Sequence, residues 1–154
     1  ASNIDFGRGA REVTPRDVVE AAEAASAVEF IAAREGRYAS AVAQGGSNFS
    51  GGQKQRLAIA RAVARGGGVM IFDDSFSALD YKTDRDVRAA LRRTAADATV
   101  IIVAQRIGTV RGADRILVVD RGRIVGAGTH SELLETCSVY REIALSQLSE
   151  EELA

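Results

Sequence analysis

The fold of this chain is decided by the stretch Asn48-Phe49-Ser50-Gly51-Gly52-Gln53-Lys54-Gln55-Arg56. A hydroxyl and two glycines stand directly in front of a helix-like run, Leu57 to Arg65. Such a turn points several backbone N–H groups, and the positive end of a helix dipole, at one spot. Glycine is required where a side chain would block the close approach of the backbone. The stretch therefore predicts a turn that holds an anion, in particular a phosphate.

The residues before this turn predict a mainly helical segment. Thr14 is a good N-cap and Pro15 suits the first position of a helix that runs to about residue 27. A second short helix is expected over residues 28–33, and the polar, glycine-containing residues 34–49 predict a loop.

The residues after the turn predict alternating strands and helices. Val69 to Phe72 and Val100 to Val103 are short continuous apolar runs, which are typical of parallel strands buried on both faces. A helix is expected from Asp84 to Ala96 between them. The remaining expected elements are a short helix near 107–111, strands at 116–119 and 123–125 joined by a turn, a helix begun by a capping box at 129–132, and a last helix at 139–148.

Composition narrows the function classes. The chain has 154 residues, of which 46% are hydrophobic and 27% charged, as in an ordinary globular protein. Its formal net charge is −1, so there is no global basic field for nucleic acid. A single cysteine excludes an internal disulfide and fits a reducing compartment. No apolar run is long enough to span a bilayer.

Asp73 and Asp74 end the first predicted strand. Carboxylates at the carboxyl end of a parallel strand lie where such sheets bind ligands. One carboxylate can hold Mg²⁺, and the next can orient or deprotonate an attacking water. The alternative interpretation is a solvated acidic turn.

Two further segments follow the predicted strands. Ser77-Ala78-Leu79-Asp80 comes just after the two carboxylates, although by itself it could be the N-cap region of the next helix. Gln105 follows the second strand and can reach the same ligand edge, or it can cap the helix from 106 to 111.

Together these motifs resemble the ATPase domain of ABC proteins, and specifically the nucleotide-binding domain of an ABC exporter. The resemblance extends over essentially all of the chain and includes its closing segment. The matching motifs, in order, are Ser50-Gly51-Gly52-Gln53 with Gln55-Arg56, then Ile71-Phe72-Asp73-Asp74, Ser77-Ala78-Leu79-Asp80, Val103-Ala104-Gln105-Arg106, Asp114 to Asp120, Gly122 to Val125 and Gly128 to Leu133.

The resemblance implies an α/β fold with part of a P-loop NTPase (RecA-like) core. Residues 1–65 would be the ABC-type α-helical subdomain, and residues 66–154 the C-terminal half of the core. ATP and Mg²⁺ would be the cofactors, with Asp73 as the Walker B metal residue. The signature motif Ser50, Gly51, Gly52 and Gln53 would bind ATP held by a second nucleotide-binding domain. The D-loop would be Ser77, Ala78, Leu79 and Asp80.

The sequence departs from the family in informative ways. It has no Walker A loop, so it resembles only the portion that follows the family's glutamine loop, and the isolated chain is expected to be inactive. Asp74 occupies the position of the catalytic glutamate, and Gln105 that of the switch histidine. Asp is shorter, and Gln cannot carry a proton or a positive charge. The resemblance is therefore to the degenerate-site subunit of a heterodimeric exporter.

The expected function is to supply the signature motif of an ATP-driven exporter, at the cytoplasmic face of the cell membrane, to a partner subunit's ATP site. Transmembrane coupling helices would be the second partner, near Gln44, and nucleic acid is not an expected partner. The isolated chain would be soluble. Two alternatives remain: a soluble ABC-type ATPase of DNA repair or translation, and a non-enzymatic docking module. His130, the only histidine, is expected to cap the following helix rather than to act in catalysis.

Overall fold

Three helices begin at reciprocal capping boxes in the computed structural model, which describes residues 1–6 and 12–148. At each box a Ser or Thr side chain accepts the backbone N–H three residues on, and that residue's side chain accepts the N–H of the cap. The pairs are Thr14 with Asp17, Ser50 with Gln53, and Thr129 with Glu132. These helix starts agree with the sequence signals.

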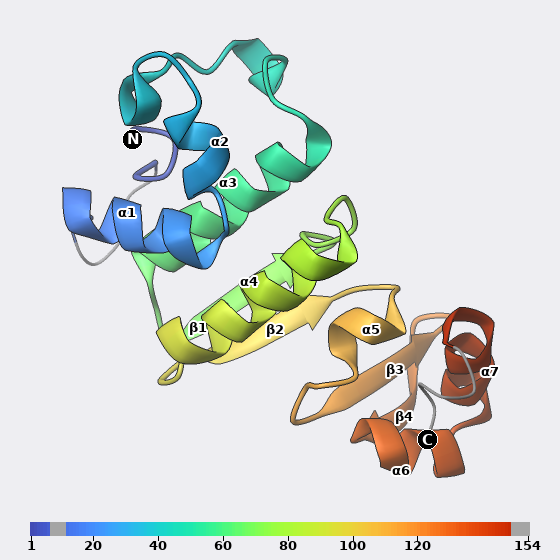
Figure 1. The fold of residues 1–154 in the computed structure, drawn as a ribbon. Coiled ribbons are helices and arrows are strands. Elements are labelled where there is room, and N and C mark those ends of the chain that lie inside the picture. Colours follow the sequence, from blue (N-terminus) through green and yellow to red (C-terminus); the bar gives the residue numbers. More distant parts are fainter. Residues whose placement is uncertain (7–11, 149–154) are drawn as a thin grey trace. The chain divides into compact units, whose positions relative to one another are not determined.

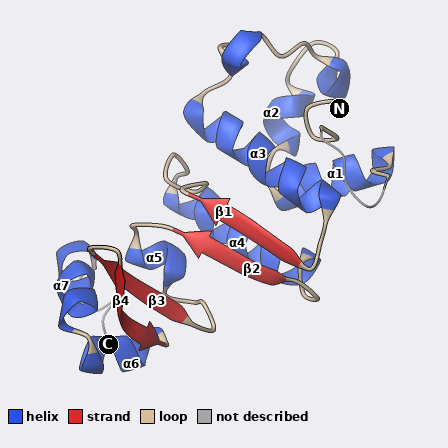
Figure 2. Cartoon of the chain, turned by 180° about the vertical axis from the view of Figure 1, so that it is seen from behind, coloured by secondary structure: helices blue, strands red, loops and turns tan. Residues whose placement is uncertain are grey.

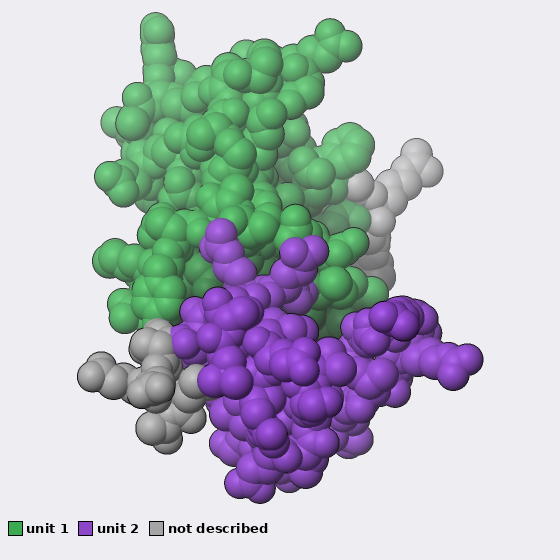
Figure 3. Space-filling view, turned by 90° about the vertical axis from the view of Figure 1, so that its right-hand side faces the viewer, with its two compact units in different colours: residues 1–103 green, residues 104–154 purple. Residues whose placement is uncertain are grey.

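The contacts divide the chain into two units, residues 1–103 and 104–154 (Figure 3). The first unit contains α1 (Pro15–Ala24), α2 (Val28–Ala32), the 3₁₀ turns η1 (Arg37–Ala39) and η2 (Gln44–Gly46), α3 (Gly51–Arg65), β1 (Val69–Asp73), α4 (Tyr81–Thr94) and β2 (Thr99–Val103). The second contains α5 (Ile107–Val110), β3 (Ile116–Asp120), β4 (Arg123–Gly128), α6 (His130–Thr136) and α7 (Ser138–Gln147).

β1 and β2 form a parallel pair with Val69 opposite Thr99 and Asp73 opposite Val103. Figures 1 and 2 show α4 against one face of this pair. The prediction that these strands are buried on both faces is wrong for this chain: Met70 and Phe72 are buried, whereas Ile71 is 65% exposed. The physical reason is that the described elements cover only the face that α4 packs against.

One hydrophobic core joins the elements of the first unit. α1 and α3 lie side by side (Figure 1) and contribute small residues such as Ala22 and Ala60 to it. Phe72 from β1, Phe76 from the loop after it and Leu91 from α4 complete it. The core therefore joins the signature helix α3 to the strand that ends at the two carboxylates.

The second unit has its own core around an antiparallel hairpin. β3 and β4 pair with a register shift between Val118 and Val119. Ile116 and Val118 point into this core with Leu133 of α6 and Tyr140 of α7. The hairpin and the two helices after it agree with the sequence prediction.

α4 begins at residue 81, three residues before the predicted start at Asp84, because Asp80 acts as its N-cap. The predicted loop of residues 34–49 contains the two 3₁₀ turns, which the sequence did not indicate. The division into residues 1–65 and 66–154 concerns a larger domain and stays a prediction. Across residues 1–6 and 12–148, no helix combines the length and the apolar character required to cross a membrane.

Candidate nucleotide site

The predicted phosphate turn is the first turn of α3. The Oγ of Ser50 accepts the N–H of Gln53 at 3.3 Å, and the Oε1 of Gln53 accepts the N–H of Ser50 at 3.1 Å. The first N–H groups of a helix have no acceptor within the helix, so those of Gly51 and Gly52 point towards an external acceptor. The Ser50 hydroxyl can still donate its proton, and so can the Gln53 amide. The turn is thus a set of donors held in place by its own capping box.

Gly52 packs directly against the loop that follows β1. A β-carbon at position 52 would lie 2.8 Å from the carbonyl oxygen of Ala78, which is closer than such atoms approach. At Gly51 the nearest atom would be the Ala78 Cβ at 3.7 Å, an ordinary contact. The glycine at position 52 therefore has a structural requirement besides the approach of a phosphate.

Gln55 joins the same loop to α3 through its side-chain amide. Its Nε2 donates to the carbonyl oxygen of Asp74 and to the Oγ of Ser77, both at 3.0 Å. Its Oε1 accepts the N–H of Ala78 at 2.9 Å. The structure thus brings the signature turn, the second carboxylate and the D-loop segment together.

Asp73 and Asp74 stand at the carboxyl end of β1, as predicted, and both side chains are exposed. Asp74 has a left-handed backbone, with φ 47°, and its N–H donates to the carbonyl oxygen of Val103 at 3.0 Å. Its Oδ2 accepts a hydrogen bond from the Ser77 Oγ at 3.0 Å, which draws the short carboxylate towards its own loop. The donor set suits Mg²⁺, because this ion is usually held by one or two carboxylates together with substrate phosphates and water.

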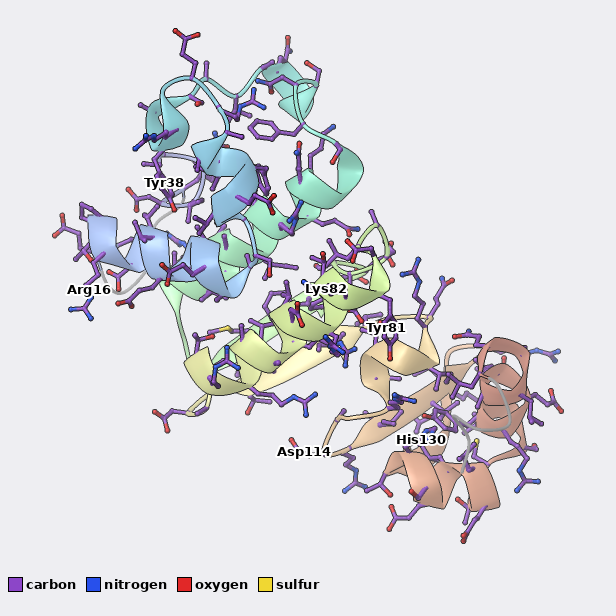
Figure 4. All side chains as sticks on the ribbon, in the orientation of Figure 1. Arg16, Tyr38, Tyr81, Lys82, Asp114 and His130 are labelled. Atoms are coloured by element: carbon purple, nitrogen blue, oxygen red, sulfur yellow. The ribbon has the colours of Figure 1, made fainter. Side chains whose placement is uncertain are left out.

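Asp80 closes the D-loop segment as the N-cap of α4. Its carboxylate accepts the N–H and the hydroxyl of Thr83 at 2.9 and 2.7 Å. These two hydrogen bonds are the main reason that the pKa of Asp80 lies below its ordinary value, and the charge of Arg56 adds to the effect. Figure 4 shows Tyr81 and Lys82 on the first turn of the same helix. The N-cap interpretation of this segment is therefore correct for Asp80, and its role towards a nucleotide remains a prediction.

Phe49, the residue directly before Ser50, is held by an aromatic and cationic cluster. The guanidinium of Arg34 lies 4.2 Å from the centre of its ring, and the ring of Phe30 meets it edge-on at 6.1 Å. The guanidinium of Arg56 lies 4.8 Å from the centre of the Phe30 ring and donates to the carbonyl oxygen of Ser26 at 2.8 Å. The cluster fixes the chain just before Ser50 against α2.

Gln105 lies in the second unit, two residues after β2. Its side chain is exposed, and its carbonyl oxygen accepts the Nε2 of Gln147 at 2.9 Å. The Oε1 of Gln147 accepts the N–H of Ile107, also at 2.9 Å. The segment at 105–107 is therefore held by α7 rather than by the Gln105 side chain, and α5 has no side-chain cap.

His130 does not cap α6, so that expectation is wrong. Thr129 and Glu132 provide the capping box, while the His130 Nδ1 lies 2.7 Å from the hydroxyl of Tyr140. Burial, and to a smaller extent the charge of Arg111, lowers the pKa of His130 below its ordinary value. Tyr140 is buried in the core of the second unit, so this contact indicates a packing role for His130.

Sequence reasoning assigned no role to Gln55 or Gln147. In the sequence Gln55 is only one residue of a motif, and its contacts lie 19 to 23 residues away in the chain. Gln147 reaches 40 and 42 residues back. Neither contact has a local signal, because each depends on how separate elements pack.

Known proteins with similar sequences are ABC transporter proteins. Residues 6–77 match the model of the ABC transporter family. The chain is 50% identical over 148 residues to an uncharacterised ABC transporter ATP-binding protein of Mycobacterium tuberculosis, covering 96% of the chain and 25% of that protein. It is 40% identical over 150 residues to an ATP-dependent lipid A-core flippase of Vibrio vulnificus, covering 97% of the chain and 26% of the flippase.

A solved structure of a bacterial Atm1-family ABC exporter with ATP bound also matches. The TM-score is 0.88 at 36% sequence identity, over 96% of this chain and 26% of the exporter chain. The fold and these matches define an ABC-type ATP-binding domain. More particularly, the chain belongs to the ABC transporter family and is similar to part of the ATP-binding domain of the solved exporter. It spans about a quarter of the length of the curated relatives that it matches.

Proposed function

We propose that the protein containing this chain is an ATP-driven exporter, and that the chain completes the ATP site of a second nucleotide-binding domain. The observation that carries the proposal is the first turn of α3, where Ser50 and Gln53 hold each other and Ser50 and Gly51 are exposed. The N–H groups of Gly51 and Gly52 have no acceptor within the helix. Such donors at a helix N-terminus suit the phosphates of ATP. The partner domain would supply the Walker A loop that these 154 residues do not contain.

At its own site this subunit would hydrolyse ATP weakly. Mg²⁺, near Asp73, would neutralise charge on the phosphates of ATP. Asp74 would serve as a poor base, because its side chain is one methylene shorter than glutamate and is drawn back by Ser77. Gln105 could donate a hydrogen bond to a phosphate oxygen but could not carry a proton. A misplacement of about 1 Å can cost roughly a hundredfold in rate.

The arrangement in the cell follows from the same proposal. The pair of nucleotide-binding domains would be a heterodimer at the inner face of the cell membrane. The segment around Gln44 would meet the coupling helices of the transmembrane part. The isolated 154-residue chain would be inactive, and nucleic acid would not be a partner.

The test is to resolve hydrolysis by site in the full-length protein assembled with its natural partner. Vanadate trapping with labelled ATP, followed by separation of the subunits, measures the ADP retained at each Walker A loop. We expect trapped ADP at the partner's Walker A, where Ser50–Gln53 would close the site. Equal hydrolysis at both sites would overturn the proposal.

A further inference from the structure

Gln55 uses its whole side-chain amide on one loop. Both donor bonds of Nε2, to the Asp74 carbonyl oxygen and the Ser77 Oγ, and the acceptor bond of Oε1, from the Ala78 N–H, go to the segment that follows β1. One side-chain amide on α3 thus holds the loop at three residues, Asp74, Ser77 and Ala78. Its neighbour Gly52 packs against the carbonyl oxygen of Ala78 in the same place.

The loop that Gln55 holds starts from a strained residue. Asp74 has φ 47°, a conformation that non-glycine residues adopt only at a cost, although aspartate tolerates it better than most. Such residues persist when their surroundings over-determine them. Here the Asp74 N–H donates to the carbonyl oxygen of Val103, and the Asp74 carbonyl oxygen accepts from Gln55. The single hydroxyl proton of Ser77 is shared between that carbonyl oxygen and the Asp74 carboxylate. The hydrogen bond from Gln55 is the support that α3 gives to this turn.

We propose that Gln55 is a positioning residue that ties the phosphate-facing turn of α3 to the Asp74–Ala78 loop. The inference rests on the proposed function, in which Ser50–Gln53 serve ATP on the partner and Asp74 belongs to the subunit's own site. Under that arrangement, Gln55 keeps the contact offered to one ATP in register with the loop at the other. A shift of the loop would then move the signature turn as well.

The chain offers graded variants of this contact. Gln55→Ala removes all three hydrogen bonds. Gln55→Glu keeps an acceptor for the Ala78 N–H but has no donor for the Asp74 carbonyl oxygen or for Ser77. Ser77→Ala removes one of the groups that receive the amide. Arg141→Ala is the matched control, because Arg141 also bridges two backbone groups, the carbonyl oxygens of Leu134 and Glu135, but in the second unit.

The experiment measures ATP hydrolysis by the full-length protein with its partner, normalised to the nucleotide bound per complex so that unfolded protein is not counted. We expect Gln55→Ala to lower kcat about tenfold or more with KM for ATP within about twofold, since misplacement of reacting groups acts on rate. Gln55→Glu should fall between wild type and Gln55→Ala. Gln55→Ala and Ser77→Ala should be non-additive, because the two residues are in contact.

Failure of the inference and failure of the proposed function give different results. If the wild-type complex hydrolyses ATP and Gln55→Ala behaves like Arg141→Ala, the positioning role is overturned and the proposed function stands. Loss of ATP binding together with kcat, or strict additivity with Ser77→Ala, would also overturn the positioning role. If the wild-type complex does not hydrolyse ATP at all, the proposed function is overturned, and the inference with it.

Discussion

Gly52 and Ala78 approach so closely that a β-carbon at position 52 would lie 2.8 Å from the Ala78 carbonyl oxygen. We expect Gly52→Ala to lower the free energy of unfolding by about 1–3 kcal/mol, because overpacking forces the backbone to move. Replacing a helical glycine by alanine otherwise gains up to about 1 kcal/mol, so a loss would be informative. Urea unfolding of the chain measures the change.

Gly51→Ala is the matched control for this prediction. Both glycines lie in the first turn of α3, but the new β-carbon at position 51 would meet only the Ala78 Cβ, at 3.7 Å. We expect a change of less than about 1 kcal/mol, in either direction. Equal losses in the two variants would show that the close approach does not restrict position 52.

Phe49→Leu should destabilise the first unit. The change removes an edge-on contact with Phe30 and the stacking of Arg34. Together these contacts contribute about 1–2 kcal/mol. Phe6→Leu is a suitable control, because Phe6 is 67% exposed and its ring centre lies 5.5 Å from the Arg61 guanidinium. If both variants lost the same amount, the cluster around Phe49 would not be the cause.

His130 should make the second unit less stable as the pH falls. Because burial depresses the folded-state pKa of His130, the unfolded state binds a proton more readily. The stabilising contribution is therefore present above the unfolded pKa of about 6.5 and is lost as the pH falls through the folded value. Unfolding at pH 7.5 and 5.5 measures the effect. His130→Asn does not titrate and should lose this dependence, and an unchanged dependence in that variant would assign it to other groups.

The helix starts and strands could be predicted because their signals are local. Thr14, Ser50 and Thr129 each precede an acidic or amide residue by three positions, and the caps form as those patterns indicate. The apolar run from Val69 to Phe72 predicted a strand correctly. It predicted burial wrongly, because the exposure of Ile71 depends on which elements cover the sheet, and an apolar run does not contain that information.

The motifs name residues for the candidate site, but they do not predict the contacts between those residues. The motifs assign Ser50 to the ATP of a partner domain, Asp74 to the subunit's own site and Ser77 to the D-loop, and these assignments stay a prediction. In the first unit, hydrogen bonds join Ser50 to Gln53, Gln55 to Ser77, and Ser77 to Asp74. The link through Gln55 could not be predicted, because it depends on how α3 packs against the loop that follows β1. Gln105 lies in the second unit, so its relation to Asp74 stays a prediction.

The central claim is that this subunit serves its partner's ATP better than its own. Ser50→Asp keeps an N-cap for α3 but places a negative charge where the phosphate would bind. Asp74→Asn keeps the size of the side chain and tolerates the left-handed backbone, but it removes the carboxylate. The single measurement is the ATP hydrolysis rate of the two variants in the full-length heterodimer. The account predicts that Ser50→Asp lowers the hydrolysis rate about tenfold or more, because a charge repulsion of about 1.4 kcal/mol is enough for a tenfold loss. It predicts little change in the rate for Asp74→Asn. Equal losses, or an unaffected Ser50→Asp complex, would contradict it.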